Sequence, residues 1–158
     1  LVPSEDGEFV YAVSEMNDST AALSSLAFDR ETGELRLLNT VPTFGADPCY
    51  VATNGRGSVD CNYSGGTMSV FPLQKDGTLA PADTLFQGSA TGPDAIRQAT
   101  PHIHCTVFSP DGKYIFATDF SADRILRFVM HPDNPIPHAS LEAVGIEADS
   151  GPRHLTFS

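Results

Sequence analysis

The chain has 158 residues, of which 41% are hydrophobic and 18% are charged, a composition typical of a folded globular protein. Its 20 acidic and 9 basic residues give a formal net charge of −11, which disfavours nucleic acid and anionic lipid as partners. No apolar run approaches the roughly 18 residues of a membrane-spanning helix. The first residues show neither the basic nor the apolar region of a signal peptide, so we expect none among them.

The expected elements are short strands, because 12 Pro and 13 Gly spread along the chain argue against long helices. Residues 8–14 follow the turn pair Asp6-Gly7 and predict a first strand. The periodicity of residues 22–28 fits a strand or a short helix. A hairpin with residues 34–38 is the simpler interpretation, because Gly33 supplies a turn.

A similar pattern recurs about every 50 residues. Residues 67–79 repeat the hairpin with a turn at Asp76-Gly77, and residues 108–117 repeat residues 2–12. Residues 52–61 are a weaker copy, and residues 151–158 resemble residues 101–109. Repeats of this length that each hold four short strands are typical of β-propeller blades.

The sequence therefore predicts an all-β fold of about three four-stranded antiparallel blades from a larger ring. The approximate blades are residues 1–48, 49–100 and 101–150, and residues 151–158 begin the next one. Prolines predict a loop over residues 131–138. Open blade faces would favour self-association, and an unrelated β-sandwich is the alternative fold.

Three cysteines, Cys49, Cys61 and Cys105, fit neither a zinc signature nor a disulfide framework. We expect buried, reduced thiols that pack as small apolar side chains. Reduced thiols favour a cytoplasmic location, and a periplasmic location is the alternative.

Four strings carry a more specific signal. They are GADPCY at residues 45–50, NYSGGTMSVFPL at 62–73, RQATPHIH at 97–104 followed by FSPDGK at 108–113, and GPRH at 151–154. Together they resemble the seven-bladed lactonase family, which includes propeller-type 6-phosphogluconolactonases and fungal carboxymuconate cyclases. Members have more than twice this length, so the chain resembles the N-terminal half of one.

The resemblance implies hydrolysis of a sugar lactone, 6-phospho-D-glucono-1,5-lactone, to 6-phosphogluconate in the pentose phosphate pathway, without a metal or organic cofactor. The family's histidine falls on His102 or His104, and its arginine falls on Arg153. The acidic residue and second arginine of the family site would follow Ser158. The alternatives are a carboxymuconate-type lactonising cyclase, a non-catalytic propeller scaffold and an inactive fragment.

Lactone hydrolysis needs a base, donors for the oxyanion and a proton for the leaving hydroxyl group. His102 and His104 alternate with Ile103 on an expected strand, so their imidazoles should share one face. The alternatives are a loop-capping histidine beside an exposed one, or a chelating pair. Because no third ligand has suitable spacing, we expect no metal.

The guanidinium of Arg153 can bind phosphate, carboxylate or an oxyanion bidentately, although Arg153 could instead tie neighbouring blades together. Further substrate-binding candidates are polar side chains at expected strand ends and beside the histidine pair: Asn62, Tyr63, Arg97, Gln98, Asp119 and His154. The alternatives are turn chemistry for the pair before Gly65-Gly66 and a surface role for Arg97. Asp60 replaces an expected apolar strand residue, so its carboxylate needs a partner or an exposed edge.

Overall fold

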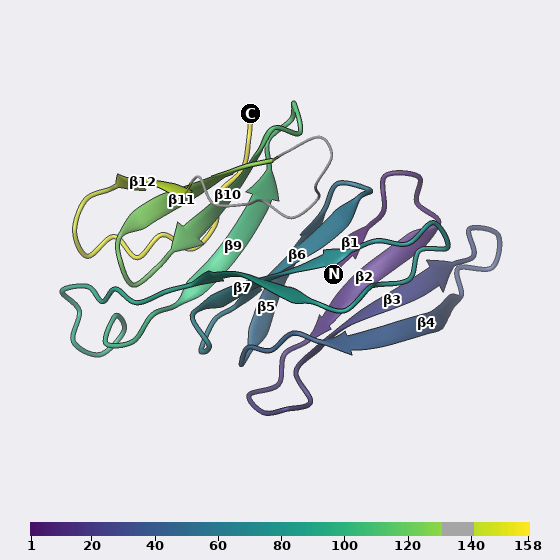
Figure 1. The fold of residues 1–158 in the computed structure, drawn as a ribbon, viewed down its shortest axis with the longest axis horizontal. Coiled ribbons are helices and arrows are strands. Elements are labelled where there is room, and N and C mark those ends of the chain that lie inside the picture. Colours follow the sequence, from purple (N-terminus) through teal and green to yellow (C-terminus); the bar gives the residue numbers. More distant parts are fainter. Residues whose placement is uncertain (131–140) are drawn as a thin grey trace.

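The computed structural model describes residues 1–130 and 141–158, and every helix or strand assigned in these ranges is a β-strand. The strands form three four-stranded antiparallel sheets, which lie side by side in Figure 1. This arrangement confirms the all-β fold with about three blades. The described ranges include no helix with the length and hydropathy needed to cross a bilayer. The expected proline-rich loop at residues 131–138 lies outside the described residues.

Each sheet is a meander in which neighbouring strands follow one another in sequence. The first sheet comprises β1 (Val2–Pro3), β2 (Phe9–Ser14), β3 (Ala22–Phe28) and β4 (Leu35–Pro42). The second comprises β5 (Pro48–Thr53), β6 (Gly57–Asn62), β7 (Thr67–Pro72) and β8 (Asp83–Gln87). The third comprises β9 (Ile103–Phe108), β10 (Tyr114–Asp119), β11 (Arg124–Val129) and β12 (Leu141–Gly145). Residues 22–28 therefore form a strand and pair with β4.

The repeated turns have the same local chemistry. Ser4 Oγ donates a hydrogen bond to Asp6 Oδ1 at 2.5 Å, and Ser109 Oγ donates to Asp111 Oδ1 at 2.6 Å. In each turn the carboxylate also accepts a backbone N–H two residues further on, as in an Asx turn. The sequence repeat is therefore also a structural repeat: the same kind of turn connects β1 to β2 and β9 to β10.

The core lies between the sheets. β6 is buried along its whole length because the second sheet has a neighbour on both faces (Figure 1). Its alternate residues Val59 and Cys61 pack with the third sheet, where Ile103, Ile115 and Leu126 are fully buried. A second apolar cluster joins the first and second sheets: Tyr11, Leu23, Val51, Phe71 and Leu79.

Strands at one edge of each sheet lie next to one another. β5 contacts both β1 and β9, so the first strands of successive sheets are neighbours. Beside the third sheet runs the C-terminal segment 151–158, where the Arg153 carbonyl accepts a hydrogen bond from Thr118 Oγ1 at 3.2 Å. The ring of Phe157 lies 5.6 Å from that of Phe116. This edge brings residues far apart in sequence to one place.

A glycine turn fixes how the second sheet meets β9. Gly66 follows β6 with φ of 61°, and a Cβ there would lie 2.7 Å from the carbonyl oxygen of Pro101. Gly112, in the turn before β10, has a similar φ of 68° with nothing within 4 Å of the same position. Of these two glycines, Gly66 alone combines a left-handed backbone with a close contact to a distant segment of the chain.

We predict that Gly66→Ala destabilises the protein by about 2–4 kcal/mol, since the left-handed penalty adds to displacement of Pro101. Gly112→Ala is the matched control and should cost only about 1–2 kcal/mol. Urea denaturation of the full chain measures both. Equal losses would show that the contact with Pro101 contributes nothing.

We also expect a polypeptide limited to these 158 residues to self-associate, because apolar side chains on both outer sheets are exposed. Phe28, Leu35 and Leu37 lie on the first sheet and Val144 on the third, with exposed fractions of 37%, 52%, 58% and 64%. Burying such surface is favourable. Light scattering should give a mass above the 16.8 kDa of one chain. A stable 16.8 kDa monomer would contradict this expectation.

Candidate functional site

Aromatic and imidazole rings form one continuous cluster near the start of β9. The Tyr63 ring stacks on His102 with centroids 4.1 Å apart and meets His104 edge-on at 5.8 Å. His104 in turn contacts His154 at 4.8 Å, and His154 lies 6.3 Å from Tyr50. We call this set the ring cluster: Tyr50, Tyr63, His102, His104, Phe120 and His154.

Backbone contacts hold Tyr63 and His102 together. The turn after β6 is anchored by the Tyr63 N–H, which donates to the Asp47 carbonyl at 2.9 Å. His102 Nδ1 lies 2.9 Å from the Tyr63 carbonyl, and its Nε2 lies 3.3 Å from Thr100 Oγ1. Because a carbonyl can only accept, Nδ1–H donates to the Tyr63 carbonyl, and Nε2 pairs with the Thr100 hydroxyl. Both nitrogens of His102 are therefore engaged.

His104 differs from His102 because one nitrogen has no partner. Its side chain lies against Tyr63 and His154 and is 6% exposed. Within the described part of the chain, Nδ1 makes no hydrogen bond. Burial, together with the nearby charges of Arg153 and His154, lowers the pKa of His104 to about 4, and a hydrogen bond with the Arg153 backbone opposes the shift. His104 is therefore neutral at pH 7 and can accept a proton.

Arg153 presents an exposed side chain beside this histidine. None of the ion pairs among residues 1–130 and 141–158 involves Arg153. Its charge affects the pKa of both His104 and the Cys49 thiol, which burial raises to about 12. A cation near the ring cluster is thus available for an anionic group.

Asp123 anchors the loops that carry the two arginines. Its Oδ1 accepts from Gln98 Nε2 and from the Gly151 N–H, both at 2.8 Å, and its Oδ2 accepts from the Asp149 N–H at 2.8 Å. Burial acts to raise the pKa of Asp123, but these hydrogen bonds outweigh burial and hold it below its usual range. One carboxylate therefore ties Gln98 to the segment that leads into Arg153.

This network changes the interpretation of Gln98. The side chain is buried, with Nε2 also donating to the Phe120 carbonyl at 2.9 Å and Oε1 accepting from the Asp94 N–H at 3.1 Å. All its hydrogen-bonding groups are used inside the protein. Gln98 braces the loop and does not face a ligand, whereas its neighbour Arg97 is exposed and lies 5.1 Å from the Phe120 ring centre.

Two further candidates are also turned away from the ring cluster. Asp119 is 1% exposed and pairs with Arg124 at 2.9 Å; burial raises its pKa and the Arg124 hydrogen bond opposes this shift. Asn62 is fully buried between the first and second sheets, beneath Gly45. Both side chains are therefore buried and engaged within the protein, and their place in a substrate site stays a prediction.

Sequence reasoning missed Tyr50, Phe120 and Asp123. Tyr50 is the last residue of the string GADPCY, and Phe120 directly follows β10. Asp123 has φ of 48° in the turn between β10 and β11, and an aspartate at a turn position was the only sequence signal available for it. No set of three or more His, Cys, Asp or Glu side chains in the described ranges is placed to hold a metal ion.

Comparison with known proteins identifies the family. The family model described as "Lactonase, 7-bladed beta-propeller" matches residues 1–158. The 6-phosphogluconolactonase of Bacillus subtilis is 28% identical over 159 residues, which cover 99% of this chain and 44% of that protein.

Solved structures agree with this match. A Bacteroides uniformis protein provisionally described as a 6-phosphogluconolactonase is 97% identical with a TM-score of 0.97, over 99% of this chain and 46% of that one. The periplasmic gluconolactonase of Pseudomonas aeruginosa is 31% identical with a TM-score of 0.84, again over 99% and 46%. The chain spans about half the length of these relatives. It belongs to the seven-bladed β-propeller lactonase family.

Proposed function

We propose that the full protein hydrolyses a sugar lactone, and that 6-phospho-D-glucono-1,5-lactone is its substrate and 6-phosphogluconate its product. The observation that carries this proposal is His104, a neutral imidazole with an unpartnered Nδ1 beside the exposed Arg153. Relatives named as 6-phosphogluconolactonases support the substrate class.

In the proposed reaction, His104 Nδ1 accepts a proton from a water molecule as the water oxygen attacks the lactone carbonyl carbon. Arg153 stabilises the negative charge that forms on the carbonyl oxygen. The bond from carbon to the ring oxygen then breaks, and the imidazolium returns the proton to the leaving oxygen. The products are a carboxylic acid and a free hydroxyl group, so atoms and charge balance.

The other residues of the ring cluster position this pair. Tyr63 contacts both imidazoles, and His102 is fixed by its two hydrogen bonds. We propose that His154 and Tyr63 pack against the sugar. Arg97, held over Phe120 at the rim, binds the phosphate. Because the global charge is −11, such local cations must attract an anionic substrate.

A cytoplasmic location belongs to this proposal. Cys49, Cys61 and Cys105 are free thiols, which supports a reducing compartment. The relative from Pseudomonas aeruginosa is described as periplasmic, so fractionation of cells with compartment markers is the measurement that decides. Recovery with periplasmic markers would contradict the proposal.

We predict that His104→Gln lowers kcat for lactone hydrolysis about 10²–10⁴-fold, because the base is lost. His102→Gln should cost less, because that ring only supports Tyr63. Hydrolysis rates are measured on the full protein after subtraction of the uncatalysed rate. Arg127→Gln, in the partly exposed pair with Glu142, is the control that should keep activity. Full activity of His104→Gln would favour a non-catalytic scaffold or another base.

Arg97→Gln separates possible substrates. We expect it to raise KM for the phosphorylated lactone about tenfold or more while changing KM for unphosphorylated gluconolactone little, because a phosphate contact is lost. Depletion of a carboxymuconate lactone is measured in parallel. Turnover of that compound alone would replace hydrolysis of a sugar lactone with the cyclase alternative.

The neutral state of His104 predicts a pH-dependent stability. Its pKa is about 4 when folded against an ordinary 6.5, so the unfolded chain binds more protons between these values. This histidine's contribution therefore falls as pH drops from 6.5 to 4. His104→Gln should gain up to about 3 kcal/mol relative to wild type over that window. Urea denaturation at each pH measures the difference, and an unchanged difference would mean that His104 titrates normally.

A further inference from the structure

A second polar site lies outside the ring cluster, between the first and second sheets. Four side chains of β6 and β7 form a group that we call the polar cluster: Asp60, Asn62, Thr67 and Ser69. Cross-strand pairing sets Asp60 opposite Ser69 and Asn62 opposite Thr67. All four are at most 8% exposed. The alternate residues Val59 and Cys61 face the third sheet, so the polar cluster faces the first.

Hydrogen bonds within the polar cluster use only part of its capacity. Asp60 Oδ1 accepts from the Ser69 N–H at 3.0 Å and from Asn62 Nδ2 at 3.3 Å. Ser69 Oγ donates to the Thr43 carbonyl at 2.5 Å and therefore accepts from Asn62 Nδ2 at 3.3 Å. This pattern fixes the orientation of the Asn62 amide, with Oδ1 as its remaining polar atom.

Three buried oxygens are left without a hydrogen-bond partner in the described part of the chain: Asp60 Oδ2, Asn62 Oδ1 and Thr67 Oγ1. No ion pair among the described residues involves Asp60. Burial raises the pKa of Asp60 to about 8, against the hydrogen bonds from Ser69 and Asn62. Neither a cation of the described residues nor solvent exposure supplies the expected partner or exposed edge, so at pH 7 the Asp60 carboxyl group keeps its proton unless a bound cation replaces it.

The loop above the polar cluster is built to approach it closely. A Cβ on Gly45 would collide with the Asn62 side chain and lie 2.5 Å from Thr67 Oγ1. On either side of this loop, Phe44 and Asp47 have φ of 59° and 53°. Left-handed conformations are unfavourable for residues other than glycine. Contacts with the rest of the protein must therefore hold this loop over the buried oxygens.

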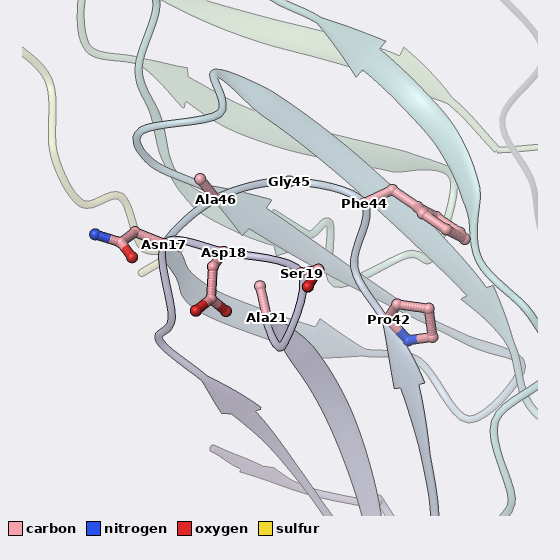
Figure 2. A pocket seen from close by; sticks show the side chains of 8 residues that line it. All are labelled: Asn17, Asp18, Ser19, Ala21, Pro42, Phe44, Gly45 and Ala46. Atoms are coloured by element: carbon pink, nitrogen blue, oxygen red, sulfur yellow. The ribbon is translucent and has the colours of Figure 1, made fainter.

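A pocket reaches this loop from outside. It has a volume of about 420 Å³ and is lined by Asn17, Asp18, Ser19, Ala21, Pro42, Phe44, Gly45 and Ala46. Figure 2 shows Gly45 and Ala46 on one wall and the carboxylate of Asp18 on the loop opposite. Gly45 therefore forms the wall between the pocket and the side chains of Asn62 and Thr67.

We propose that the polar cluster binds a small monovalent cation, Na⁺, through Asp60 Oδ2, Asn62 Oδ1 and Thr67 Oγ1. Carboxylate, amide and hydroxyl oxygens are the ligands of hard cations. A single carboxylate is neutralised by one positive charge, whereas a divalent ion would leave a net buried charge. The cation joins β6 and β7 at the face against the first sheet and stabilises that interface. This role is independent of lactone hydrolysis.

The experiment compares the Tm of the full chain in NaCl and in choline chloride at equal ionic strength, in a sodium-free buffer. Binding to the folded state alone raises Tm, and we expect Na⁺ to raise it by at least about 2 °C. Asp60→Asn should abolish the difference. Asp76→Asn, which removes an exposed turn carboxylate bonded to Thr78, is the matched control and should retain it.

Thr67→Val keeps the side-chain shape without the hydroxyl and tests the site if Asp60→Asn fails to fold. It should weaken Na⁺ binding about tenfold, measured by ²³Na relaxation on the full chain. Equal Tm values in NaCl and choline chloride would overturn the proposal, as would an undiminished Na⁺ effect in Asp60→Asn. Stabilisation by Ca²⁺ but not Na⁺ at matched ionic strength would also overturn it.

Discussion

The geometry of the site depends on the close approach of the Gly65–Gly66 turn to Pro101. With no side chain at Gly66, the turn after β6 reaches the backbone just before β9. The same turn carries Tyr63, so its ring is delivered onto His102 and its carbonyl receives the His102 N–H. Backbone contact between two sheets thereby orients an imidazole and an aromatic ring that are 39 residues apart.

The loops that lead to Arg97 and Arg153 are held together by Asp123, whose carboxylate is occupied by donors of the protein itself. Its carboxylate collects backbone and side-chain donors from two segments, one before β9 and one before Arg153. The exposed arginines can therefore stand beside the ring cluster without forming ion pairs of their own within the described ranges. Restraining the backbone while these guanidinium groups form no ion pair with the described residues suits recognition of an anionic group.

The fold was predictable because strand periodicity and Asx-type turns are local signals, repeated with the same chemistry at Ser4 and Ser109. His102 and His104 both contact Tyr63, although β9 begins at Ile103 and His102 precedes it. Polar character alone could not show whether Asn62 or Gln98 faces a ligand or another buried group. That distinction depends on tertiary contacts with Gly45 and Asp123. Tyr50 and Phe120 were missed because aromatic residues also pack between blades.

The ring cluster draws its members from the second sheet, the third sheet and the C-terminal segment. In repeat architectures each unit is stabilised mainly by its neighbours, and separate units can open individually. If a ligand contacts all three segments, opening any one of them also breaks contacts with the ligand. The free energy of local opening then increases by the free energy of those contacts. Occupancy of the site would thus act as a cross-brace, slowing amide exchange across the propeller most strongly at the ends of β5 and β9.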